Sequence, residues 1–73
     1  MTAAAHAEIL AADAVAVEGC ADRLRALAQR LRGHDAVPPW LYEQLHEHIT
    51  ACTVAAAELT VAADRLRALA DHR

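Results

Sequence analysis

Apolar residues recur every seven positions in two long segments of this chain. The two series are Leu10, Val17, Leu24, Leu31 and Leu45, Cys52, Leu59, Leu66. Such spacing, with further apolar residues between the repeats, is typical of an amphipathic helix that packs along one stripe. The pattern predicts helices over about residues 3–32 and 38–72, within a single domain of residues 1–73.

The segment between the predicted helices, residues 33–37, carries strong turn signals. Gly33 stands where a residue just past a helix C-terminus is expected. Pro38 and Pro39 can occupy the first turn of the second helix, where the missing N–H costs nothing. Val37 precedes a proline and is therefore biased toward extended geometry. We expect an all-α fold, an antiparallel two-helix hairpin.

Folding the chain about position 36 sets the register between the helices. Facing residues then have numbers that sum to 72, which brings Leu31 opposite Leu41 and Cys20 opposite Cys52. Charge agrees with this arrangement. Residues 1–20 carry three acids and no arginine, while residues 62–73, which they would face, carry three arginines. Opposite charges at the open end favour the antiparallel hairpin.

The chain is too small and too rich in alanine to stand easily alone. It has 73 residues with one Trp, one Tyr and no Phe, whereas ordering costs ~1.5 kcal/mol per residue. We expect self-association, most simply a homodimer that forms a four-helix bundle. The predicted interface residues are Leu10, Val17, Leu24, Leu31, Trp40, Leu45, Leu59 and Leu66.

Composition narrows the function classes. The net charge of −3 argues against a nucleic-acid partner, which a basic surface normally binds. No apolar run approaches the ~20 residues of a membrane span, and no standard signal peptide is present, so the expected location is the cytoplasm. Serine and a glycine-rich phosphate loop are absent. These features predict a non-enzymatic protein without a cofactor, which binds itself or another helical protein as an interaction or scaffold module.

Cys20 and Cys52 leave three alternatives open. Each can be a small apolar core residue with a free thiol. They can form a disulfide, if the alanine-rich helices bring their Cα atoms within roughly 7 Å. The third alternative is a metal-binding helical bundle. His48 lies one turn before Cys52, and two thiolates with an imidazole are three of the four ligands of a tetrahedral zinc or similar transition-metal site.

A short alanine- and leucine-rich helical hairpin with Trp40 at its bend resembles the WXG100 (ESX) proteins, which actinobacteria secrete without a signal peptide. Leu41 and Tyr42 follow the tryptophan where the family has Trp-x-Gly. The resemblance implies dimerisation, signal-peptide-independent secretion and a tolerated Cys20–Cys52 disulfide.

Overall fold

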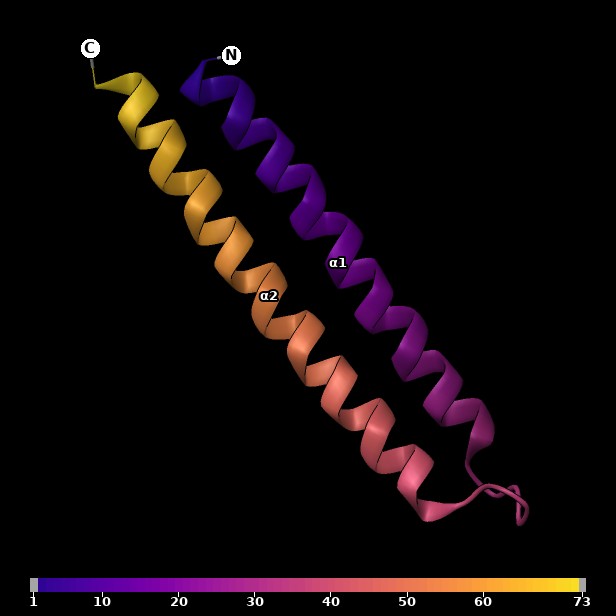
Figure 1. Cartoon of the computed structure of the whole chain (residues 1–73). Helices are drawn as coiled ribbons and strands as arrows, with labels where there is room; N and C mark the ends of the chain where they lie inside the picture. Colours follow the sequence, from indigo (N-terminus) through magenta and orange to yellow (C-terminus); the bar gives the residue numbers. More distant parts are fainter. Residues whose placement is uncertain (1, 73) are drawn as a thin grey trace.

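The computed structural model describes residues 2–72 and consists of two long helices that lie side by side and run antiparallel (Figure 1). Helix α1 spans Ala3–Leu31 and helix α2 spans Pro39–Asp71. Each helix therefore ends within one residue of the range expected from the sequence. Both chain termini lie at one end of the molecule, and the turn lies at the other. The predicted all-α helical hairpin is confirmed.

Local sequence explains where the helices begin and end. The Thr2 hydroxyl accepts a hydrogen bond from the backbone N–H of Ala5 at 3.1 Å and so caps α1. Gly33 has a φ of +84°, the left-handed conformation that a glycine adopts at low cost just past a helix. Pro38 precedes α2 and Pro39 is its first residue, where a donor would have no partner.

The tyrosine of α2 ties the two helices together beside the turn. The Tyr42 hydroxyl donates a hydrogen bond to the backbone carbonyl of Leu31, one of the last carbonyls of α1. Such carbonyls have no partner inside their own helix, so the bond closes the C-terminal end of α1. At the open end, His6 and Leu66 line one small hollow. These two pairs have numbers that sum to 73 and 72, so the helices keep the expected register.

Replacing Tyr42 by phenylalanine removes only the hydroxyl that bonds to Leu31. We expect the free energy of unfolding to fall by about 1 kcal/mol, because the variant loses the hydrogen bond from α2 to the end of α1, although the Leu31 carbonyl still accepts the backbone N–H of His34 at 3.2 Å. Urea denaturation followed by circular dichroism measures this. Thr50→Val is the control, since it removes an exposed hydroxyl from the same helix. Equal stability of the two variants would show that the tyrosine bond does not hold the turn.

The most buried line of contact between the helices is made of alanine. We name Ala7, Ala14, Ala21, Ala56 and Ala63 the alanine row; their exposed fractions lie between 0% and 6%. These alanines recur every seven residues on each helix. Leu45, 7% exposed, is the one larger buried side chain among residues 2–72. A methyl side chain lets two helix backbones approach closely, so the seam follows the smallest residues.

The sequence pattern placed this seam on the leucines instead. Leu10, Val17, Leu24, Leu31, Leu59 and Leu66 are only half-buried in the hairpin. Each leucine or valine of this set lies three residues after a position of the alanine repeat. The seam is therefore rotated by about 50° around each helix relative to the expected one. This rotation decides which side chains remain accessible.

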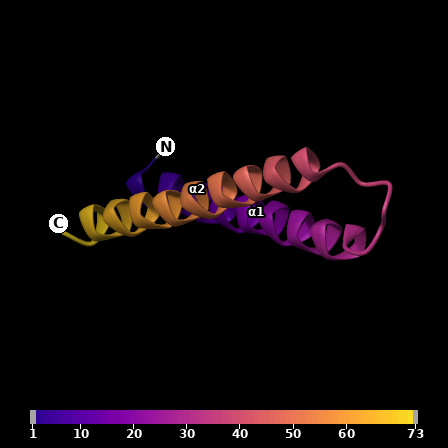
Figure 2. The ribbon, with the colours of Figure 1, turned by 90° about the horizontal axis from the view of Figure 1, so that it is seen from below.

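The hairpin is an elongated rod. It measures 59 × 15 × 14 Å with a radius of gyration of 16.7 Å, against about 11 Å for a compact domain of this length. Figure 2 shows the two helices crossing at a shallow inclination along the length of the rod. Among residues 2–72, neither helix is long and apolar enough to cross a bilayer.

Candidate functional site

One side of the rod carries most of the large aliphatic side chains. Because the helices are antiparallel and share one heptad phase, residues three positions after the alanine row point to the same side on both helices. We name this surface the leucine face. At these positions it comprises Leu10, Val17, Leu24 and Leu31 of α1 with Leu59 and Leu66 of α2, and we include Leu27, Leu41 and Leu69, which lie one position before the alanine repeat and next to the first set.

The leucine face is substantially open to solvent. Leu27 is 36% and Leu69 is 65% exposed, and the other members are half-buried. Ile9, beside Leu10, is 46% exposed. At the open end a small hollow lies between Ile9, Leu10 and Leu66, where the two helices meet. The leucine face is therefore the side of the rod on which most of the larger aliphatic side chains reach solvent.

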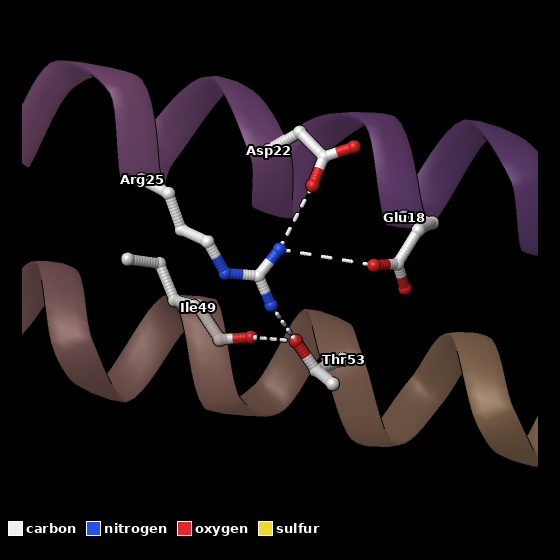
Figure 3. Close-up of polar contacts among 5 residues, drawn as sticks. All are labelled: Glu18, Asp22, Arg25, Ile49 and Thr53. Carbon is white, nitrogen blue, oxygen red and sulfur yellow. Dashed lines mark hydrogen bonds and ion pairs between the residues drawn. The ribbon is translucent and has the colours of Figure 1, made fainter.

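The opposite side of the rod is polar and internally bonded. The Arg25 guanidinium donates to Asp22 Oδ1 at 2.9 Å and lies 3.7 Å from Glu18 Oε1 (Figure 3). Its second terminal nitrogen donates to the Thr53 hydroxyl of α2 at 2.8 Å, and that hydroxyl donates to the Ile49 carbonyl at 2.8 Å. The chain itself therefore supplies partners for these polar groups.

A groove runs along the polar side because the residues at its floor are small. Ala14, Ala56 and Ala63 of the alanine row line it, with Glu18, Asp22 and Thr53 at its edges. The groove is open, and its charged groups belong in part to the Arg25 network. Its apolar lining comes from alanines and from Val15, which is 74% exposed, and no leucine of residues 2–72 lines it.

The two cysteines and His48 differ in their exposure to solvent. Cys20 and Cys52 are both free thiols of intermediate exposure. The Arg23 guanidinium donates to Cys20 Sγ at 3.0 Å, which is a contact within α1. Cys52 lies in the seven-residue series with Leu45 and Leu59, whereas His48 is exposed. Within residues 2–72, no group of three His, Cys, Asp or Glu side chains is arranged to hold a metal ion.

Trp40 also differs from its simplest interpretation. An aromatic residue beside the turn could close the end of the core against Leu31 and Leu41, but Trp40 is 60% exposed. It lies on the outer surface of α2, in the same seven-residue series as Val54 and Val61, which are 51% and 49% exposed. Tyr42 takes the position against α1 instead.

The expected charge pairing between the helices does not form. All three ion pairs among residues 2–72 join residues of one helix: Arg25 with Glu18 and Asp22, and Arg67 with Asp64. The polar link between the helices that sequence reasoning missed is the Arg25–Thr53 hydrogen bond. In the sequence, this bond was indicated only by Thr53, whose hydroxyl can bond back to the Ile49 carbonyl one turn earlier and can accept from Arg25 of the other helix.

No protein-family model, curated protein or solved structure matches this chain. The geometry of its two sides therefore carries the functional argument alone.

Proposed function

We propose that this protein is a non-enzymatic helical hairpin that pairs with a second copy of itself through the leucine face, forming a four-helix bundle that serves as an interaction or scaffold module. The observation that carries the proposal is that the alanine row and the leucine face have different positions in the hairpin. Alanines close the hairpin, and the leucines, which have the larger apolar surface, remain half-exposed on one side. In a bundle, those leucines would form the central core.

The accessible surface of the single chain supports pairing. It is 5420 Å², against about 4400 Å² expected for a compact monomer of 7.8 kDa. The leucine face runs the length of a rod 59 Å long and 15 Å wide, a projected area close to the ~800 Å² per partner of a standard stable interface. Covering this face would remove a comparable area from water.

Sedimentation equilibrium tests the proposal. We expect the protein to have twice the 7.8 kDa mass of one chain. The double variant Leu27→Glu/Leu69→Glu should sediment as a monomer that keeps its helical circular dichroism. Both side chains are exposed in the hairpin but would be buried in the bundle, where unpaired carboxylates are strongly unfavourable.

Val15→Glu is the control, because it also replaces an exposed aliphatic side chain by a carboxylate, but on the polar side, and should leave the dimer intact. A wild-type chain that stays monomeric up to about 1 mM, where association provides only about 4 kcal/mol, would contradict self-association. The leucine face would then have to be covered by a different helical protein.

A further inference from the structure

The charges of α1 are sorted along its length. Its first part, up to Gly19, carries Glu8, Asp13 and Glu18 and no arginine, whereas its last part carries Arg23, Arg25 and Arg30 with one acid, Asp22. On the side of the leucine face, Asp13 lies in the acidic part and Arg23 and Arg30 lie in the basic part, so an antiparallel copy of α1 on that face would bring opposite charges together. The same helix laid parallel to its copy would place like charges together.

Four of these charges, Glu8, Asp13, Arg23 and Arg30, take part in no ion pair among residues 2–72, and the heptad positions of the last three place them on the side of the leucine face. Asp13 takes part in none of the ion pairs among residues 2–72, and the Arg23 guanidinium contacts only the Cys20 sulfur. Both side chains are exposed. Asp13 shares a heptad position with Cys20 and Leu27, on the edge of the leucine face, and Arg23 lies one row further out. Both are therefore placed to meet a partner on that face.

We propose that the dimer is antiparallel, with α1 packed on the partner's α1, α2 packed on the partner's α2, and the two turns at opposite ends of the bundle. This inference rests on the proposed self-association and adds its geometry. A twofold axis through the middle of the rod passes at the level of Glu18. Facing residues of the two α1 helices then have numbers that sum to 36.

With this twofold axis, an acidic residue lies level with an arginine, and aliphatic residues lie level with aliphatic residues. On α1, Asp13 lies level with the partner's Arg23, and Leu27 lies level with the partner's Ile9. Because residue 18 of α1 is level with residue 55 of α2, facing α2 residues have numbers that sum to 110. Leu69, the most exposed leucine, therefore lies level with the partner's Leu41. One placement thus covers Leu27 and Leu69 and pairs Asp13 with the partner's Arg23.

The alternative bundle, with both turns at the same end, packs α1 on the partner's α2. Residues of α1 and of the partner's α2 at the same height along the rod then have numbers that sum to 73, as they do within one hairpin. Arg23 would lie opposite the partner's Thr50, and Asp13 opposite the partner's Thr60, so neither charge would be paired. Leu27 would lie opposite the partner's His46. This arrangement loses the complementarity that the antiparallel one provides.

Distance measurement between spin labels distinguishes the two arrangements. The label is attached to His34→Cys in the exposed turn, with Cys20→Ala and Cys52→Ala removing the native thiols. Opposite turns should give a distance of about 50–60 Å, close to the length of the rod, whereas adjacent turns would give under about 25 Å. A short distance overturns the antiparallel arrangement while self-association stands. Monomeric wild-type protein overturns both.

A charge exchange tests the same contact in the native-cysteine chain. Asp13→Arg and Arg23→Asp should each raise the dissociation constant about fivefold to tenfold, since each contact occurs twice in the dimer. The double exchange should return it to within about threefold of wild type. Glu8→Arg, which makes the same change in net charge on the polar side, should have little effect. A double variant no tighter than the weaker single variant overturns the proposal.

Discussion

Replacing Ala21 by leucine is expected to destabilise the hairpin by about 2–3 kcal/mol. Ala21 has no exposed surface and is the member of the alanine row on α1 that lies closest to the turn. Three added carbons would have to separate the helix backbones or force strained rotamers along a seam built for methyl groups. For a domain of this size, the melting temperature should fall by about 10–20 °C.

Thermal unfolding followed by circular dichroism measures this, with Ala26→Leu as the matched control. Ala26 belongs to the same helix but is exposed on its outer surface, so the added carbons meet solvent and the helix propensity changes equally. The control should melt within a few degrees of wild type. If Ala21→Leu melted as high as Ala26→Leu, the close approach of the helices at the alanine row would be refuted.

The second large effect is expected at Leu45. It is 7% exposed and is the largest side chain buried between the helices. Leu45→Ala should lower the free energy of unfolding by about 2–3 kcal/mol. The variant loses the favourable free energy of transferring the leucine side chain from water to the interior, and it leaves a cavity near the turn. Few other large side chains could move in to fill that space, since the rest of the buried seam consists of alanine.

Urea denaturation at a fixed protein concentration measures the Leu45 effect. Val15→Ala provides the comparison, because Val15 is 74% exposed on the polar side and its truncation should change stability by less than about 0.5 kcal/mol. Equal losses for the two variants would mean that Leu45 is not a core residue. A fixed concentration is required since association adds to apparent stability.

The architecture was predictable because it depends on local signals. Gly33 and the two prolines interrupt an otherwise continuous helical pattern, and the structure ends α1 and begins α2 beside them. The register followed from the same turn, since a short connection leaves few ways to fold back. These features involve residues close in sequence, where the physical rules are strongest.

The rotation of the seam was not predictable from hydropathy. Leucines, valines and alanines together occupy all seven heptad positions of α1, and an apolar scale does not reveal which of these positions meet the other helix. Side-chain volume decides: Ala14 and Ala63 permit a closer approach than Leu10 and Leu66 do. The same rotation turned His48 outward and left Cys52 in the partly buried series, so the proposed metal ligands do not converge.

The alanine row alone does not fix the register of the two helices. Its members are identical and evenly spaced, so sliding one helix by a heptad, about 10 Å, would match alanine with alanine again. Within the row, nothing opposes such a slide. The connection between Leu31 and Pro39 opposes it, with Gly33 and the Tyr42 bond holding its two ends. The length of the turn therefore fixes the register. A seven-residue insertion in the turn would allow a second alignment of the two helices that is nearly equivalent along the alanine row.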